Sequence, residues 1–132
     1  MSASNPVTSE AARQPTVLLV DDEAALLKLM ALRLSRLGWK VHTAPDAVSA
    51  ISIAERLSCH LNLLITDVNM PGMSGDALIR HIRMACPFVD VLAISGALPE
   101  RHTGLANIQC LRKPFSMDRL AEAAHEILSA QL

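Results

Sequence analysis

Five short strand-like runs, most of them apolar and separated by helix-like segments, constrain the fold of this chain more than any other feature. The runs lie at residues 16–20, 40–44, 62–66, 89–94 and 108–111. Each is too short for a buried helix, and the first run, at residues 16–20, lacks the alternation of a half-exposed strand. Such runs are typical of strands in a parallel sheet that is covered on both faces.

The segments between the runs have the apolar spacing of helices that pack on one side. They span residues 24–37, 46–58, 75–85 and 117–130, while residues 97–106 are weakly helical at best. Side chains predicted to face inward are Leu27, Met30, Leu34, Leu37, Val48, Ile51, Leu57, Leu78, Ile79, Ile82, Leu120, Ala124, Ile127 and Leu128. Asp46 is a candidate N-cap, and Gly38 is expected to end the first helix. The alternation predicts an α/β fold with right-handed crossovers.

The length of 132 residues predicts one domain at residues 16–132, preceded by a polar, disordered lead-in at residues 1–15. Hydrophobic residues make up 51% of the chain, enough for a sizeable core. The aromatic residues are only Trp39, Phe88 and Phe115, and the net charge is -1. We therefore expect no direct nucleic-acid binding, since base-stacking aromatics are few and there is no basic excess.

No apolar run reaches the roughly 18 residues of a membrane span, and no signal peptide is evident at the N-terminus. We therefore expect a cytoplasmic protein that does not bind membranes. The cysteines Cys59, Cys86 and Cys110 are odd in number and lack metal-ligand spacing. They are interpreted as reduced, buried thiols. The histidines likewise lie apart from one another and are interpreted as surface residues.

Polar side chains stand where the predicted strands end. Asp21 and Asp22 follow the first strand, Asp67 the third and Ser95 the fourth, and Lys113 comes shortly after the fifth. The carboxyl ends of strands in open α/β sheets meet at one edge, where such folds bind ligands. Any one of these residues alone would be an ordinary helix cap, turn or surface residue. Together they predict a functional site.

Three neighbouring carboxylates repel one another unless a cation compensates, and Mg²⁺ suits oxygen ligands of this kind. The cation would also shield an incoming phosphoryl group. Asp67 could then attack phosphorus and form an acyl phosphate. Lys113 and the hydroxyl of Ser95 would stabilise the phosphoryl oxygens.

Four segments resemble the receiver domains of response regulators in two-component signal transduction. They are VLLVDDE, LLITDVNMPGMSG, LAISG and LRKPF, and the resemblance covers roughly residues 16–130. It implies a (βα)5, doubly wound, flavodoxin-like fold with five parallel strands in the order 2-1-3-4-5. The function implied is phosphorelay signalling, in which a sensor histidine kinase or a histidine-phosphotransfer protein donates the phosphoryl group. A homodimer is compatible with this resemblance.

The resemblance also assigns roles to residues. Asp67 would be the phosphoacceptor, and Asp22 and Asp67 would bind Mg²⁺ directly. Asp21 would act partly through water, and the backbone carbonyl of Asn69 would be a further ligand. Lys113 would contact the phosphoryl group together with Ser95, and its peptide bond to the following proline would be cis. The domain would catalyse only its own phosphorylation and dephosphorylation, so it is not expected to be a turnover enzyme.

The last third of the chain departs from the family pattern. Many receiver domains carry Tyr or Phe three residues before the lysine, where this chain has Cys110. The stretch from Ser95 to Lys113 is about one helical turn short, so the fourth helix is expected to be short or irregular. We therefore treat residues 96–107 as the segment that responds to phosphorylation.

Two other function classes stay open at this point. A Mg²⁺-dependent phosphatase with an aspartyl nucleophile usually has an acid two residues after the nucleophile, and here that residue is Asn69. A pseudo-receiver would act as a binding scaffold without phosphorylation and with an atypical output face. The cognate kinase, the output and the membership of a longer protein are not determined by the sequence.

Overall fold

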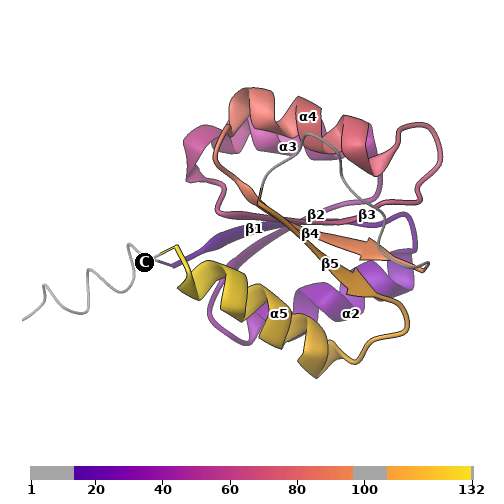
Figure 1. Cartoon of the computed structure of the whole chain (residues 1–132), viewed down its shortest axis with the longest axis vertical. Helices are drawn as coiled ribbons and strands as arrows, with labels where there is room; N and C mark the ends of the chain where they lie inside the picture. The colour runs from indigo at the N-terminus through magenta and orange to yellow at the C-terminus, as the bar shows by residue number, and fades with distance from the viewer. Residues whose placement is uncertain (1–13, 97–106, 132) are drawn as a thin grey trace, which may run out of the picture.

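A five-stranded parallel sheet forms the centre of the computed structural model, which describes residues 14–96 and 107–131 (Figure 1). The strands are β1 (Thr16–Val20), β2 (Lys40–Ala44), β3 (Leu63–Asp67), β4 (Asp90–Ser95) and β5 (Ile108–Arg112). They run in the order β2-β1-β3-β4-β5. The predicted α/β fold and strand order are therefore confirmed.

The central strands β1 and β3 are buried along their whole length. Their apolar sequences suit this position, because helices cover both faces of the sheet. The predicted bounds of β1 and β2 match the structure, β3 and β4 are each shifted by one residue at both ends, and β5 is one residue longer at its end. From β1 the chain goes to β2 on one side and then crosses to β3, β4 and β5 on the other side. The carboxyl ends of β1 and β3 therefore lie side by side at the point where the direction of the strand order reverses.

Within the described part of the chain, four helices cover the two faces of the sheet (Figure 1). On one side lie α2 (Ala24–Ser35) and α5 (Met117–Ser129), and on the other α3 (Ala47–Leu57) and α4 (Gly75–Ala85). A short 3-10 turn, Ser58–His60, follows α3. Each pair of helices encloses an aliphatic core against the sheet.

Most side chains predicted to face inward are in these two cores. The fully or nearly fully buried ones are Leu27, Met30, Leu34, Leu78, Ile79, Ile82, Leu120, Ala124, Ile127 and Leu128. Ile51 and Leu57 are partly buried against the core beneath α3 and α4. The N-cap prediction at Asp46 is also confirmed, because its Oδ1 accepts the N–H of Ser49 at 2.8 Å.

Two inward-facing predictions were wrong. Val48 is 77% exposed, because α3 turns its alanine stripe at Ala47, Ala50 and Ala54 to the core. Small side chains let this helix lie close to the sheet, and the larger valine is left outside. Leu37 is exposed as well, since α2 ends at Ser35 and tight turns lead to Gly38, whose φ of 85° favours glycine.

The cysteine prediction is correct at one site and wrong at another. Cys86 is buried, but Cys110 is exposed on β5, the edge strand of the sheet. The side chain of Cys59 lies outside the described part of the chain. The expected lead-in lies largely at residues 1–13 and the weak helix at residues 97–106, and both fall outside the described residues as well. None of the described helices has the length and apolar character needed to cross a membrane.

Candidate functional site

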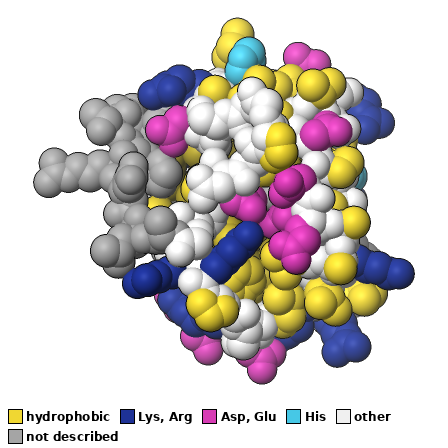
Figure 2. Space-filling model, turned by 90° about the vertical axis from the view of Figure 1, so that its right-hand side faces the viewer, with side chains coloured by type: hydrophobic (Ala, Val, Ile, Leu, Met, Phe, Trp, Pro, Cys, Tyr) yellow, Lys and Arg dark blue, Asp and Glu magenta, His cyan; other side chains and the backbone are white. Residues whose placement is uncertain are grey.

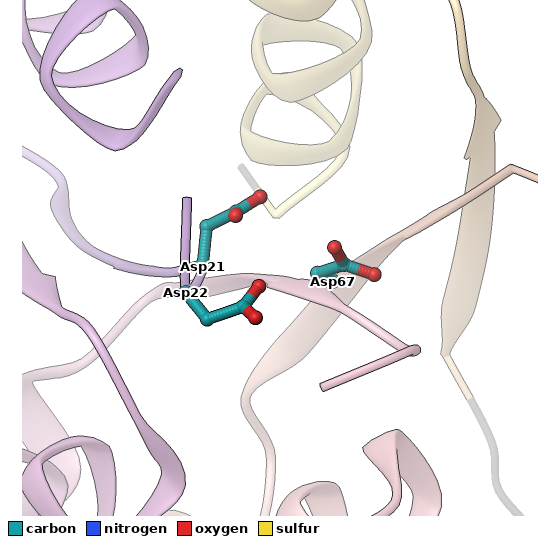
Figure 3. A group of neighbouring side chains, drawn as sticks. All are labelled: Asp21, Asp22 and Asp67. Carbon is teal, nitrogen blue, oxygen red and sulfur yellow. The ribbon is translucent and has the colours of Figure 1, made fainter. Parts of the chain in front are cut away.

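Three aspartates meet at the carboxyl edge of the sheet (Figure 3). Asp21 and Asp22 follow the last residue of β1, and Asp67 is the last residue of β3. One carboxylate oxygen from each lies within 4.8 Å of the other two. Asp21 is 1% exposed and Asp67 is 5% exposed, whereas Asp22 is open to solvent. The predicted convergence of these carboxylates is therefore present.

Asp21 uses only one of its two oxygens in local structure. Its Oδ1 accepts the N–H of Glu23 at 2.8 Å, in the turn that leads into α2. Its Oδ2 is buried and has no hydrogen-bond partner among the described residues. A helix-start role explains the first oxygen but not the second, because a buried oxygen without a partner is costly. The second oxygen is therefore available to a ligand.

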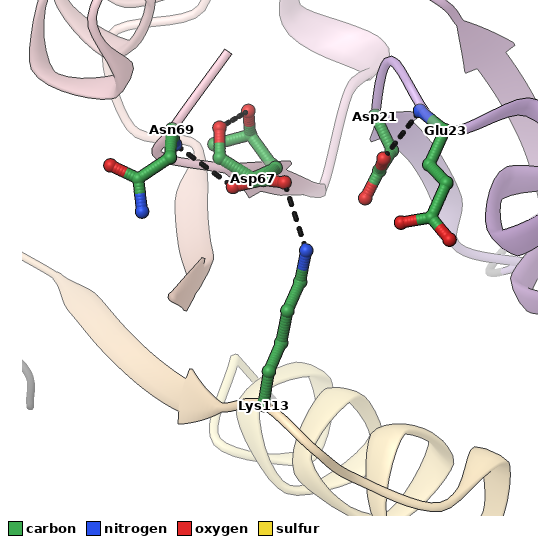
Figure 4. Close-up of polar contacts among 6 residues, drawn as sticks. Asp21, Glu23, Asp67, Asn69 and Lys113 are labelled. Carbon is green, nitrogen blue, oxygen red and sulfur yellow. Dashed lines mark hydrogen bonds and ion pairs between the residues drawn. The ribbon is translucent and has the colours of Figure 1, made fainter. Parts of the chain in front are cut away.

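Both oxygens of Asp67 are held by neighbouring groups (Figure 4). The backbone N–H of Asn69 donates to Oδ1 at 2.8 Å. The ammonium group of Lys113 donates to Oδ2 at 3.0 Å, as an ion pair. The carboxylate thus has a defined orientation from two sides.

Lys113 immediately follows β5, and its side chain reaches Asp67 from there. Its backbone N–H donates to the carbonyl of Ser95 at 2.8 Å, so the last residue of β4 fixes the start of the lysine. The Lys113–Pro114 peptide bond is cis, as the family resemblance implied. The contact with Ser95 therefore positions the backbone from which the lysine side chain extends.

The pKa values of Asp21 and Lys113 are both shifted by burial and by nearby charges. Burial raises the pKa of the Asp21 carboxyl, and the nearby charge of Asp67 adds to the increase. Partial burial lowers the pKa of Lys113, but the hydrogen bond that Lys113 donates to Asp67 and the charges of Asp67, Asp21 and Glu23 outweigh it, so that pKa is raised overall. The lysine therefore stays cationic and partly balances the acids.

Glu23 is a member of this site that the sequence analysis did not single out. Its charge acts on Lys113, and its backbone N–H orients Asp21 (Figure 4). The only signal in the sequence was its place as the third acid of the Asp21-Asp22-Glu23 run. An exposed glutamate at a helix start is so common that this signal was weak.

The other two predicted site residues lie at or just after the ends of β4 and β3. Ser95 ends β4, one residue beyond the pairing of Asp67 with Ile94. Asn69 is exposed, and its backbone N–H points toward Asp67. The structure brings Asp21, Asp22, Asp67 and Lys113 together through side chains, and it places Ser95 and Asn69 through the backbone contacts described above.

The surface at this edge has a polar centre. Figure 2 shows acidic side chains gathered near the middle of the face, beside a basic side chain and bordered by apolar ones. Oxygen ligands in such a cluster suit a hard divalent cation. An anionic ligand could bind beside Lys113 only after a cation has compensated the negative charge of the three aspartates.

Comparisons with known proteins agree with this arrangement. Residues 17–125 match the response regulator receiver domain family. The sensor kinase CckA of Brucella abortus is 35% identical over 120 residues, which cover 88% of this chain and 13% of that protein. The probable transcriptional regulatory protein TcrX of Mycobacterium tuberculosis is 34% identical over 109 residues, covering 80% of this chain and 46% of that protein.

Solved structures give the same result. The receiver domain of the hybrid histidine kinase CckA has a TM-score of 0.77 at 33% identity and covers 86% of this chain and 98% of that one. A response regulator receiver protein from Sinorhizobium medicae has a TM-score of 0.78 at 28% identity, covering 90% and 98%. The chain spans less than half the length of the two curated relatives named above. With its fold, its acidic edge and these relatives, the chain belongs to the response regulator receiver domain family of two-component signalling systems.

Proposed function

We propose that this domain accepts a phosphoryl group on Asp67 in a Mg²⁺-dependent reaction and thereby changes its interactions with partners. The observation that carries the proposal is the orientation of Asp67, whose two oxygens are held by Asn69 and Lys113 beside two further acids. A carboxylate that is buried, oriented and paired with a cation is well placed to act as a nucleophile.

The residues present fit a magnesium ion. Asp21 has a buried oxygen without a hydrogen-bond partner among the described residues. Asp21, Asp22 and Asp67 each offer one carboxylate oxygen within 4.8 Å of the other two. We propose Asp22 and Asp67 as direct ligands, Asp21 as a ligand acting partly through water, and the carbonyl of Asn69 as a further ligand. When bound, the ion supplies positive charge that offsets carboxylate repulsion and draws a phosphoryl group toward the site.

In the proposed reaction, a carboxylate oxygen of Asp67 forms a bond to phosphorus. The bond between phosphorus and the donor histidine nitrogen breaks, and its electron pair stays on that nitrogen. Lys113 then exchanges its contact with Asp67 for a phosphoryl oxygen, and the hydroxyl of Ser95 donates to another. Water later hydrolyses the acyl phosphate, and the domain itself assists both steps.

The donor follows from the family. Its members work in two-component systems, and the relatives include histidine kinases and transcriptional regulators. We propose a phosphohistidine on a sensor histidine kinase or a histidine-phosphotransfer protein as the donor, a cytoplasmic location, and partner binding rather than direct nucleic-acid binding as the output. A homodimer is a further proposed assembly. Kinase activity and gene regulation are activities of the longer relatives, and this chain covers only part of them.

The proposal is tested by incubating the chain with Mg²⁺ and acetyl phosphate and measuring its intact mass. One added phosphoryl group is expected in the wild type, and none after Asp67→Asn or after chelation of the metal. Asp46→Asn is the matched control, because it changes another aspartate that follows a strand but keeps its capping oxygen. No adduct on the wild type would contradict the proposal and favour a scaffold that is never phosphorylated.

A further inference from the structure

Thr66 is a polar residue at a position where the sheet is otherwise aliphatic. It is 0% exposed on β3 and immediately precedes Asp67. Leu64, which shares its face of the strand, packs in the aliphatic core beneath α3 and α4. Valine has the same branched shape and would fill this position without burying a hydroxyl group. A threonine here therefore needs a partner for its hydroxyl.

The structure supplies that partner. The hydroxyl of Thr66 donates to the backbone carbonyl of Asp67 at 3.0 Å, in a buried hydrogen bond. Pairing between β1 and β3 ends at Val20 and Thr66, so Asp67 lies one residue beyond it. In the same peptide unit, the N–H of Val68 donates to the carbonyl of Ile94 on β4 at 3.0 Å. The unit between Asp67 and Val68 is thus held at its carbonyl and at its N–H.

This planar unit leads directly to the amide that orients the carboxylate. The N–H of Asn69 donates to Oδ1 of Asp67 while Lys113 donates to Oδ2 (Figure 4). Rotation of a rigid peptide plane between Asp67 and Val68 would displace the Asn69 amide from Oδ1. Small displacements of a reacting group slow a reaction considerably.

We propose that Thr66 is a positioning residue for phosphorylation, whose hydroxyl holds the Asp67 carbonyl so that the Asn69 amide stays on the reacting carboxylate. This inference rests on the proposed function of Asp67. It assigns a role to a residue whose side-chain hydroxyl contacts the backbone of Asp67, and neither the phosphoryl group nor the metal ion.

Two substitutions separate positioning from packing. Thr66→Val keeps the shape and removes the hydroxyl, so the phosphorylation rate with saturating Mg²⁺ and acetyl phosphate should fall about fivefold while stability is kept. Thr66→Ser keeps the hydroxyl and removes a methyl group, so the rate should stay within about twofold of wild type while stability falls. Thr16→Val is the matched control, because Thr16 is a buried threonine at the opposite end of β1.

A second measurement does not depend on phosphorylation. Exchange of the Asn69 amide with solvent, followed by NMR in the full chain without phosphodonor, should be faster in Thr66→Val than in wild type and unchanged in Thr66→Ser and Thr16→Val. Rates that follow stability, with the serine variant slower than the valine variant, would overturn the inference. Unchanged Asn69 exchange in Thr66→Val would overturn it too, whereas a wild type that takes no phosphoryl group would contradict only the proposed function.

Discussion

The two edges of the sheet carry polar side chains in different ways. At the amino edge, the polar groups satisfy one another. The side chain of Asn62 accepts the N–H of Thr16 at 2.8 Å, and the amide of Gln131 donates to Asp90 at 2.6 Å and to the carbonyl of Asn62 at 3.0 Å. These contacts join the starts of β1, β3 and β4 to the end of the chain, which is a structural role.

At the carboxyl edge, like charges are brought together instead. Asp21, Asp22 and Asp67 crowd around one another with Lys113 as the cation in contact with Asp67, and a buried oxygen of Asp21 has no partner among the described residues. This arrangement opposes folding unless a ligand completes it, which is typical of functional sites. Changes at the two edges should therefore affect different properties.

Of the substitutions considered, removal of the Lys113 side chain should have the largest effect. It should slow phosphorylation and leave stability nearly unchanged. In Lys113→Ala the rate of phosphorylation by acetyl phosphate should fall about 100-fold, because a charged donor to the reacting group is lost. The free energy of unfolding should change by less than about 1 kcal/mol, because the ion pair is partly open to solvent. Stopped reactions analysed by intact mass give the rate, with Arg112→Ala as the exposed neighbouring control. A rate within twofold of wild type would break the contrast between the edges.

A substitution at Gly75 tests whether the loop after β3 contributes both to stability and to the phosphorylation rate. A Cβ atom on Gly75 would lie 2.8 Å from the Cα of Val68 and 3.0 Å from its Cβ, so the backbone must move. Gly75→Ala should lower the free energy of unfolding by about 2 kcal/mol, measured by urea titration, and should also slow phosphorylation. At Gly96, an added Cβ meets no described atom within 4 Å, so Gly96→Ala should leave stability unchanged. Equal stability of the two variants would show that the loop adapts freely.

Asn62 probes the amino edge. Asn62→Ala leaves the N–H of Thr16 without its side-chain acceptor and should lower the free energy of unfolding by about 1 kcal/mol. The phosphorylation rate, measured well below the melting temperature, should equal that of wild type. A slower rate at unchanged Mg²⁺ dependence would mean that the two edges are coupled through β3.

Asp21 should show a smaller effect of opposite sign. Burial raises the pKa of Asp21 in the folded state above its ordinary value of 3.8. Between 3.8 and the raised pKa, the folded state therefore binds more protons than the unfolded state, and stability falls as pH rises through this interval. With metal chelated, Asp21→Asn should therefore be more stable than wild type by about 0.5–1 kcal/mol near neutral pH. The difference should vanish below pH 3.8. Urea titrations across this range measure it, and a variant less stable than wild type at neutral pH would contradict the strain assigned to this edge.

Strand and site positions could be predicted because they depend on local patterns. Each buried strand is a short apolar run, and Asp21 and Asp67 stand where such runs stop. Parallel pairing then brings those ends together, whatever the details of packing. Helix orientation was harder to predict. Val48 and the alanines beside it both fit a helical period, and only the closeness of α3 to the sheet decides which side chains face inward.

The exposure of Cys110 and the roles of Glu23 and Thr66 depend on tertiary context. Cys110 is exposed because its strand lies at the edge of the sheet. Thr66 looks like any β-branched strand residue in the sequence, and its significance comes from one hydrogen bond to the next carbonyl. The charge of Glu23 raises the pKa of Lys113, and the fold brings these two residues near each other although they are far apart in the sequence.

Identification of the residue that carries the phosphoryl group tests the role of Asp67 most directly. The chain is incubated with Mg²⁺ and acetyl phosphate, and sodium borohydride then reduces any aspartyl phosphate to homoserine, which peptide mass spectrometry locates. Homoserine is expected at position 67 alone, and it should be absent when the metal is chelated. Homoserine at position 21 or 22, or a phosphoryl group on any other residue with position 67 unmodified, would contradict the assignment of Asp67 as the phosphoacceptor.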